Sequence, residues 1–174
     1  APNVTSDRVC APCTPGTFSN VSSLGACFTC GADEFQHSAG QGFCSKHTVC
    51  AAGERQMVAP TATSDRACRN CEPGTFTNAT NLAMCFPCGA DEFQEQAGQG
   101  ACLAHSVCAA GRRMTRAPTA TQDRACEDCT TGRFSASADA AACEACAPSS
   151  WNAAPAQTSC TACAAGRVND TQPT

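Results

Sequence analysis

This chain of 174 residues holds 18 cysteines but only 8 phenylalanines, one tryptophan and no tyrosine, and its formal net charge is −4. So much cysteine beside so few large apolar side chains predicts small modules held by cross-links instead of one hydrophobic core. No basic stripe is available to neutralise phosphates, and no apolar run approaches the roughly 18 residues of a membrane span, so neither nucleic-acid binding nor a membrane span is expected in this segment.

The cysteines repeat with a period of 58 residues. Six cysteines from Cys10 to Cys50 recur one period later, and five recur again in a third copy, where the sixth, Cys163, comes three residues early. The first two copies, 10–67 and 68–125, are identical at 37 of 58 positions. A fixed period predicts tandem cysteine-rich modules that contact their neighbours and stack as an elongated rod.

The period also sets the expected module boundaries. We expect the tail of a preceding module at 1–10, cysteine-rich modules at 11–68 and 69–126, and a divergent, incomplete module at 127–174. Because the chain opens and closes inside a module, the sequence favours one period of a longer tandem array.

Turn residues alternate with short extended segments inside each module. The Pro-Gly-Thr-Phe strings at 15–18 and 73–76 predict a turn followed by a short β-strand. The segment 32–36 predicts a short turn, and no segment shows a helical period. The hydroxyl-rich stretches 59–63 and 117–121 are predicted to be extended connectors. The expected fold is therefore small, disulfide-rich and mostly irregular, with short β-strands.

Every copy carries an aromatic residue at the same two stations. The first station holds Phe18, Phe76 and Phe134, and the second holds Phe35, Phe93 and Trp151. We predict that these rings pack inside their modules instead of contacting a ligand, because the modules offer little other apolar volume.

Pairs of cysteines two residues apart fit a four-cysteine zinc site as well as a disulfide framework. The first four cysteines of each copy have the zinc spacing, but the last two, such as Cys44 and Cys50, would lie outside the site. We therefore predict disulfides, with no metal and no cofactor.

Four N-glycosylation sequons indicate a secretory route to the cell surface or the extracellular space, where disulfides persist. The sequons begin at Asn3, Asn20, Asn78 and Asn169. We predict N-linked glycans at these asparagines.

Histidine and aspartate recur beside the cysteines, but they do not predict catalysis. His47 and His105 each precede a cysteine by three residues, and a catalytic pair would need that cysteine as a free thiolate. Asp7, Asp65 and Asp123 each precede an arginine, and we predict that their carboxylates cap turns. No enzymatic activity is expected.

The remaining charged groups do not predict a site either. The acidic pairs 33–34 and 91–92 supply fewer oxygens than the roughly six to eight that calcium takes. Arg112, Arg113 and Arg116 form the one basic cluster, which we interpret as a solvated face.

Two motifs resemble a known extracellular family. The Cys-x-Pro-Gly-Thr-Phe strings at 13–20 and 71–78 resemble the opening loop of a cysteine-rich module of the tumour necrosis factor receptor family. The segments 30–68 and 88–126, which open with Cys-Gly-Ala-Asp-Glu-Phe-Gln and end with Asp-Arg-x-Cys, look like its continuation. The ephrin-receptor-like cysteine-rich repeats share this style and stand as the second match.

The resemblance implies local disulfides between successive cysteines. The implied pairs are Cys13–Cys27, Cys30–Cys44, Cys50–Cys68, Cys71–Cys85, Cys88–Cys102, Cys108–Cys126, Cys129–Cys143 and Cys146–Cys160. Cys10 and Cys163 remain, and their implied partners lie in adjoining modules. A crossed pattern, in which Cys10 bonds Cys27 and Cys13 bonds Cys30, stays open because sequence does not decide connectivity.

The repeats and the family resemblance point to two different functions. The near-identity of two copies favours a structural repeat unit of an extracellular fibre, appendage or matrix, because each unit of a fibre meets the same neighbour. Its partners would be neighbouring copies of the same repeat. The alternative, implied by the resemblance, is a receptor ectodomain that binds another extracellular protein.

Overall fold

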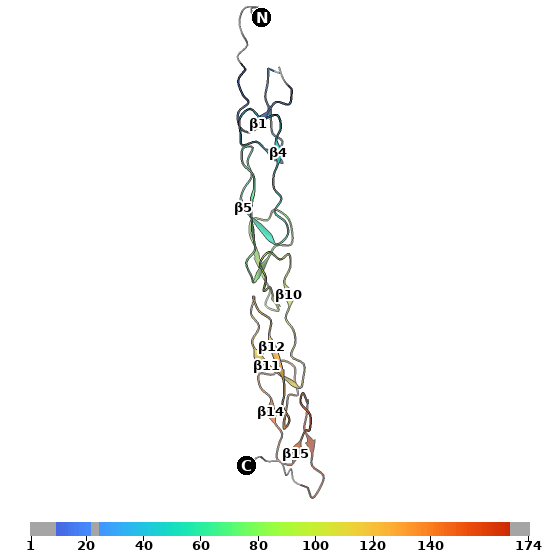
Figure 1. Cartoon of the computed structure of the whole chain (residues 1–174). Coiled ribbons are helices and arrows are strands. Elements are labelled where there is room, and N and C mark those ends of the chain that lie inside the picture. Colours follow the sequence, from blue (N-terminus) through green and yellow to red (C-terminus); the bar gives the residue numbers. More distant parts are fainter. Residues whose placement is uncertain (1–9, 22–24, 168–174) are drawn as a thin grey trace, which may run out of the picture. The chain divides into compact units, whose positions relative to one another are not determined.

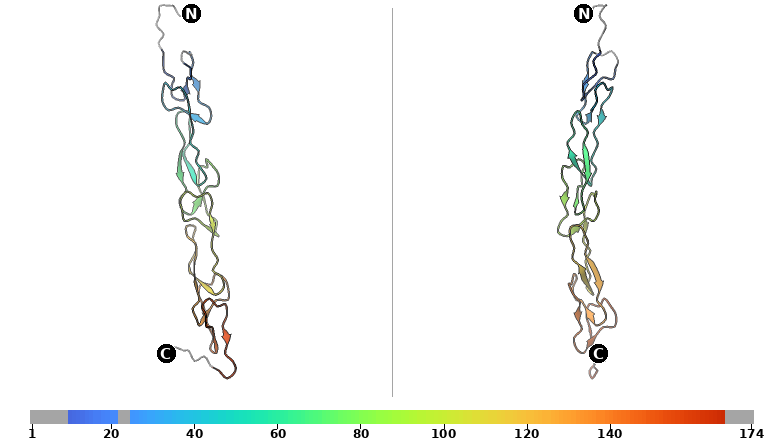
Figure 2. Two further views of the ribbon diagram at one scale, coloured as in Figure 1. Left: turned by 45° about the vertical axis from the view of Figure 1, so that its right-hand side comes forward. Right: turned by 60° about the vertical axis from the view of Figure 1, so that its left-hand side comes forward.

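The computed structural model describes residues 10–21 and 25–167. These residues form sixteen short β-strands and no helix, and most of the chain between the strands has no regular structure (Figures 1 and 2). Together with eight disulfides in tandem modules, this confirms the predicted fold class of a small, disulfide-rich and mostly irregular protein with short strands.

The chain divides into two compact units. The first contains the described residues up to Cys71 together with Thr77–Phe86 and Gly98–Gly100, and the second contains Glu72–Phe76, Pro87–Ala97 and the described residues from Ala101 onward.

Each odd-numbered strand pairs with the even-numbered strand that follows it into a two-stranded antiparallel sheet. In chain order the strands are β1 (Thr17–Phe18), β2 (Phe28–Thr29), β3 (Glu34–Phe35), β4 (Ser45–Lys46), β5 (Glu54–Val58), β6 (Ala67–Asn70), β7 (Thr75–Phe76), β8 (Phe86–Pro87), β9 (Glu92–Phe93), β10 (Leu103–Ala104), β11 (Arg112–Arg116), β12 (Ala125–Asp128), β13 (Arg133–Phe134), β14 (Glu144–Ala145), β15 (Ser150–Trp151) and β16 (Thr161–Ala162). As predicted, a turn and a short strand follow each Pro-Gly, at β1 and at β7.

The longest hairpins, β5–β6 and β11–β12, end in tight turns. These turns replace the extended connectors that we predicted for 59–63 and 117–121. Thr61 pairs with Ser64 across one turn, and its hydroxyl lies 2.7 Å from the Ser64 hydroxyl. Hydroxyl side chains that bond locally favour a turn over an extended segment, which explains the difference.

Cysteine sulfurs make up most of the buried apolar interior. The structure contains disulfides between Cys13 and Cys27, Cys30 and Cys44, Cys50 and Cys68, Cys71 and Cys85, Cys88 and Cys102, Cys108 and Cys126, Cys129 and Cys143, and Cys146 and Cys160. Cys10 and Cys163 are free, and since all the cysteines lie in the described residues, the crossed pattern is not formed. Cys50, Cys71, Cys108 and Cys129 are fully buried.

Buried amide side chains satisfy the backbone where no strand does so. The Gln36 side chain donates to the Phe43 carbonyl oxygen at 2.8 Å and accepts from the Ser38 N–H at 3.0 Å. Gln94 makes the same two bonds one period later. Gln36 holds the loop after β3, and Gln94 holds the loop after β9. Each side chain bonds one backbone carbonyl and one backbone N–H that no strand pairs.

Candidate functional site

Hydrogen bonds fasten the segment that contains Asn81 and Leu82 against Cys50 and the β5 strand of the first unit. The Cys50 N–H donates to the Asn81 side-chain oxygen at 3.0 Å, and the Asn81 N–H donates back to the Cys50 carbonyl at 2.9 Å. The Gln56 N–H donates to the Leu82 carbonyl at 2.7 Å. Asn81 has a φ of 58°, a left-handed conformation that asparagine tolerates better than most residues. We call this arrangement the first junction.

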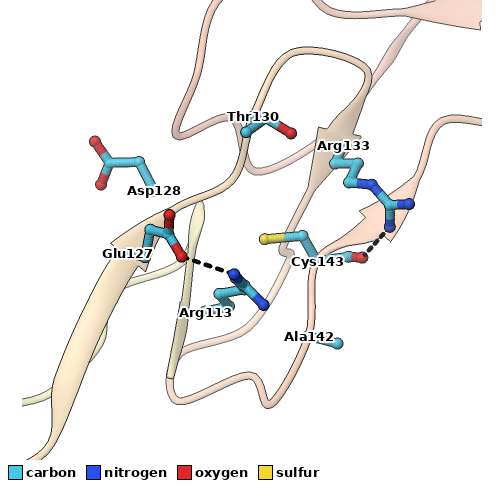
Figure 3. Close-up of a pocket in the computed structure, with 7 residues that line it drawn as sticks. All are labelled: Arg113, Glu127, Asp128, Thr130, Arg133, Ala142 and Cys143. Carbon is cyan, nitrogen blue, oxygen red and sulfur yellow. Dashed lines mark hydrogen bonds and ion pairs between the residues drawn. The ribbon is translucent and has the colours of Figure 1, made fainter. Parts of the chain in front are cut away.

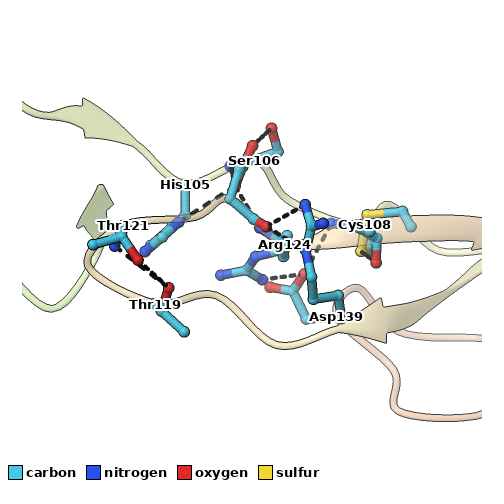
Figure 4. A network of polar contacts seen from close by, with 11 residues as sticks. His105, Ser106, Cys108, Thr119, Thr121, Arg124 and Asp139 are labelled. Carbon is cyan, nitrogen blue, oxygen red and sulfur yellow. Dashed lines mark hydrogen bonds and ion pairs between the residues drawn. A yellow bond between two sulfur atoms is a disulfide. The ribbon is translucent and has the colours of Figure 1, made fainter. Parts of the chain in front are cut away.

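The second unit repeats the junction one period later (Figure 4). The Cys108 N–H donates to the Asp139 carboxylate at 2.8 Å, and the Met114 N–H donates to the Ala140 carbonyl at 2.7 Å. Asp139 also forms an ion pair with Arg124, which lowers the pKa of its carboxyl. The two units therefore share one backbone scaffold at this point, and an ion pair is added in the second.

The first junction presents exposed apolar side chains. Val49 precedes Cys50, Met57 and Val58 follow Gln56 on β5, and Met84 lies two residues after Leu82. Met57 is 47% exposed and Met84 is 61% exposed, and the two valines are exposed to a similar degree. We call Val49, Met57, Val58 and Met84 the apolar junction surface. Sequence reasoning missed it, because these residues follow no strand or helix period.

The second junction presents a different surface on the same scaffold. Val107 keeps its apolar character, but the positions of Met57, Val58 and Met84 are taken by Thr115, Arg116 and Ala142, all exposed. The Arg116 guanidinium donates to the Asp123 carbonyl oxygen at 3.0 Å.

The differences between the first two copies lie on the surface. Among the described residues, the differing positions are exposed or half-buried in both copies with one exception, where Ser19 becomes the buried Thr77. The identical positions include the cysteines, the turn glycines and the Asp-Arg pairs. The copies thus keep the residues that build the fold and vary those that meet solvent or a partner.

A charged pocket of about 260 Å³ lies in the second unit, beside the β11–β12 hairpin and the β13–β14 pair (Figure 3). Its lining residues are Arg113, Glu127, Asp128, Thr130, Arg133, Ala142 and Cys143. Arg113 forms an ion pair with Glu127 at 2.7 Å across the hairpin, and Arg112 forms one with Asp128 at the same distance. The predicted basic cluster is therefore partly neutralised by the facing strand.

The repeated aspartates bind a distant loop instead of capping a local turn. Asp123 accepts from the Ser106 N–H at 2.9 Å, from the Ser106 hydroxyl, and from the Arg124 N–H at 2.8 Å. Asp65 does the same with Thr48, again 17 residues away. The bond from the Ser106 hydroxyl is the main cause that lowers the pKa of Asp123 to about 2, and the bond from the Thr48 hydroxyl does the same for Asp65. Asp7 lies outside the described residues.

We expect the hydrogen bond from the Ser106 hydroxyl to Asp123 to make the free energy of unfolding of the second unit depend on pH. The Asp123 pKa falls from 3.8 to about 2 on folding, so its contribution is complete above about pH 4 and is lost as the pH falls toward 2. Ser106→Ala should raise the folded pKa toward 3.8 and flatten this dependence. The measurement is the urea midpoint under non-reducing conditions from about pH 5 to about pH 2.

Ser106→Thr is the matched control, because the first unit has Thr48 at this place and its hydroxyl makes the same bond. It should keep the wild-type slope. Identical slopes in the wild type and Ser106→Ala would show that the bond does not hold the loop.

Histidine rings cover the second aromatic station. Phe35 stacks on His47 with ring centroids 5.3 Å apart, and Phe93, which is only 8% exposed, stacks on His105 at 5.2 Å. Trp151 at the same register is 43% exposed, so it does not pack as the predicted plug.

The reason is a substitution at the ring's partner. In the third copy Cys163 takes the register of His105, and its N–H bonds the Ser149 carbonyl as the His105 N–H bonds that of Asp91. A stacking ring is therefore absent beside Trp151. At the first station Phe18 lies 6.0 Å from Phe28, centroid to centroid, and Phe76 and Phe134 are half-buried.

The predicted glycosylation sites are only partly within the described residues. Asn20 and Asn78 are exposed, whereas Asn3 and Asn169 lie outside the described residues. In the described ranges no three His, Cys, Asp or Glu side chains gather as a metal site would require. No helix in the described part of the chain is long and apolar enough to cross a membrane.

Comparison with protein families matches two segments, 30–68 and 88–126, to the TNFR/NGFR cysteine-rich region. These two segments are tumour necrosis factor receptor-like cysteine-rich repeats. Both matched segments begin at the fourth cysteine of a copy, Cys30 or Cys88, and end at the Asp-Arg-x-Cys closure, which is the stretch whose resemblance was noted in the sequence.

Two curated proteins resemble the TNFR-like chain. Tumor necrosis factor receptor superfamily member 14 of Mus musculus is 29% identical over 130 residues, covering 73% of this chain and 36% of that protein. Tumor necrosis factor receptor superfamily member 6B of Homo sapiens is 29% identical over 141 residues, covering 76% of this chain and 39% of that protein. The chain thus spans less than two fifths of the length of either relative.

Solved structures give a weaker likeness. A chain in the crystal structure of the mouse RANKL-OPG complex aligns with a TM-score of 0.32 at 18% identity, covering 84% of this chain and 96% of that one. A chain in the human RANKL/OPG complex aligns with a TM-score of 0.32 at 20% identity, covering 83% and 79%. We draw nothing further from either alignment.

The curated relatives overturn the expected role as a fibre or matrix segment. Both are members of a receptor superfamily, so the structural interpretation of the TNFR-like chain is wrong. That interpretation took the near-identity of two copies as a sign that each meets the same neighbour. The identical positions include the cysteines, turn glycines and Asp-Arg pairs that build the scaffold, and the differing positions that the structure describes are exposed or half-buried apart from Ser19 and Thr77.

Proposed function

We propose that this chain is part of a non-enzymatic receptor ectodomain that binds a protein ligand of the tumour necrosis factor type. The observation that carries the proposal is the match of 30–68 and 88–126 to the TNFR/NGFR cysteine-rich region, supported by two relatives that are named as members of the tumor necrosis factor receptor superfamily. The ligand class is taken from the names of those relatives.

We further propose that the ligand docks on the apolar junction surface of the first unit. These exposed methionine and valine side chains flank, along the chain, the bonded residues of a disulfide-fixed junction, and a partner can bury them with little loss of order in the scaffold. Methionine adapts to an irregular partner surface, and aliphatic side chains at the centre of an interface supply its desolvation energy. In the second unit Val107 is the one large apolar side chain left at the four equivalent positions, so we place the docking surface on the first unit.

The location, modules and glycans belong to the same proposal. An extracellular or cell-surface position fits the disulfides and the sequons. The modules would run over 11–68 and 69–126, with a tail at 1–10 and a divergent module at 127–174. Glycans on the exposed Asn20 and Asn78 would cover surface beside the first aromatic station, and Asn3 and Asn169 would carry the others.

The test measures binding of the chain to a panel of purified tumour necrosis factor-type ligands by surface plasmon resonance. We expect at least one ligand to bind the wild type, and the double variant Met57→Thr, Val58→Arg to lose about tenfold or more in affinity. This variant carries the residues that β11 already has at these positions, so it should fold.

The reciprocal variant Thr115→Met, Arg116→Val is the control and should bind as the wild type does. If no ligand of the panel binds the wild type, the proposed function is wrong. If the Met57, Val58 variant binds as tightly as the wild type, the ligand docks elsewhere.

A further inference from the structure

We propose that the pocket of the second unit holds a carboxylate side chain of the protein ligand, gripped by Arg133 and Arg113. This inference rests on the proposed function in that the bound partner is a protein. A volume of about 260 Å³ is below the roughly 300 Å³ at which small-molecule pockets begin, so the pocket suits one side chain better than a metabolite.

Arg133 supplies a guanidinium with unused donors. It stands on β13, is exposed, and donates one bond to the Cys143 carbonyl oxygen at 3.2 Å. It forms no ion pair with any carboxylate of the described residues. A guanidinium carries five N–H donors in a planar fork that matches a carboxylate, so Arg133 can bind an acidic side chain with two parallel bonds.

Arg113 is held in position by its own ion pair. One nitrogen of Arg113 donates to Glu127 at 2.7 Å, and Figure 3 shows its guanidinium between Glu127 and the Cys143 side of the pocket. The remaining donors of Arg113 are thus fixed beside the cavity without cost in side-chain order at the moment of binding.

The two carboxylates at the rim do not compete for the site. Glu127 is already paired with Arg113, and Asp128 is paired with Arg112 at 2.7 Å. Figure 3 shows the Asp128 carboxylate turned away from Arg113 and Arg133. Arg112, Arg113 and Arg133 stand against Glu127 and Asp128 here, so the pocket and its paired rim carry one net positive charge toward an incoming anion.

The internal repeat separates this role from the fold. Arg133 has Thr75 as its register equivalent on β7 and Thr17 on β1, so the strand forms without arginine. Threonine favours a β-strand, so the arginine is not needed for this strand to form. At the rim, Glu127 and Asp128 replace Arg69 and Asn70 of the earlier copy.

The test uses the whole chain and two capped peptides, acetyl-Ala-Glu-Ala-amide and acetyl-Ala-Gln-Ala-amide, at matched ionic strength. The readout is the NMR signal of the arginine side-chain N–H groups. We expect the glutamate peptide to shift the Arg133 and Arg113 signals saturably, and the glutamine peptide to leave them in place. Arg133→Thr should abolish the shift of Arg113, and Glu127→Gln should weaken binding by about threefold, because Arg113 loses the ion pair that positions it.

Several results would overturn the inference. Equal shifts with both peptides, or an undiminished shift in Arg133→Thr, would show that no carboxylate is gripped there. Acetate or inorganic phosphate that binds as tightly as the peptide at the same ionic strength would show a general anion site instead of a side-chain pocket. Thr75→Arg, placed on β7, is the control for adding an arginine elsewhere and should leave the Arg133 signal unchanged.

Failure here is distinguishable from failure of the proposed function. If a protein ligand binds the wild type and Arg133→Thr with equal affinity, the pocket proposal falls and the receptor proposal stands. If no protein ligand binds while the glutamate peptide still shifts Arg133, the receptor proposal falls and the pocket is a carboxylate site for another partner.

Discussion

Replacing Gly111 by alanine is expected to unfold the second unit. Gly111 has a φ of 88°, and a Cβ built there would lie 2.2 Å from the carbonyl oxygen of Ala156. The obstacle is backbone, which cannot rotate away like the end of a side chain. Both backbone groups of Gly111 are also engaged, with its N–H bonding the Ser135 carbonyl and its carbonyl accepting from Cys129.

The expected loss is several kcal/mol. A left-handed φ alone costs a non-glycine residue about 1–2 kcal/mol, and a clash with fixed backbone brings the total into the exceptional range above about 4 kcal/mol. The measurement is the free energy of unfolding from urea titration under non-reducing conditions. Gly53→Ala should behave alike in the first unit, where the built Cβ lies 2.1 Å from the Gly98 carbonyl oxygen.

Gly132→Ala is the matched control. Gly132 has a φ of 77°, but a Cβ there meets nothing within 4 Å. This variant isolates the cost of the backbone conformation and should lose about 1 kcal/mol. Equal losses in Gly111→Ala and Gly132→Ala would show that the close approach of Ala156 does not shape the unit.

Removing the Cys108–Cys126 disulfide, by changing both residues to alanine, is expected to have the second large effect. The bond spans 18 residues, and the chain-entropy model assigns about 3 kcal/mol to a loop of this size. Cys108 is fully buried, and Cys126 pairs with Met114 in the β11–β12 hairpin, so packing and pairing are lost with the bond. Thermal unfolding followed by circular dichroism should show either that the second unit is already unfolded or that its midpoint temperature is lowered by tens of degrees.

Phe93→Leu tests whether the apolar interior matters as much as the bond. Phe93 is the most buried aromatic residue in the described part of the chain, yet a volume-reducing change to leucine should cost only about 1–1.5 kcal/mol. If Phe93→Leu destabilises the unit as much as loss of the disulfide does, the interior and not the cross-link dominates its stability.

Much of the fold follows from the cysteines, because a period of 58 residues repeats a covalent framework. The strands after each Pro-Gly were also predictable from turn chemistry. The turn at Thr61 was not, because a stretch of threonine and alanine reads as extended until its hydroxyls find local partners. The partner of Asp65 escaped prediction for a similar reason, since Thr48 lies 17 residues away and no local pattern links them.

The candidate site was harder to predict than the fold. The apolar junction surface depends on the bond between Gln56 and Leu82, which brings Met57 and Met84 to one junction from separate parts of the sequence. A signal was nevertheless present, because the position of Met57 changes to Thr115 between copies that are identical at 37 of 58 positions. The position of Trp151 in the repeat predicted a packed ring, but Trp151 is exposed. The histidine that would stack on it is replaced by Cys163 in the third copy.

Peptide mapping without reduction, on the chain secreted from eukaryotic cells, tests the central claim that local cross-links hold a receptor-like scaffold. We predict linked peptides for the pairs such as Cys13–Cys27 and Cys50–Cys68, separated by 14 or 18 residues, with Cys10 and Cys163 joined to none of the other sixteen. Peptides that link Cys10 to Cys27 and Cys13 to Cys30, or cysteines that are all free thiols, would contradict it.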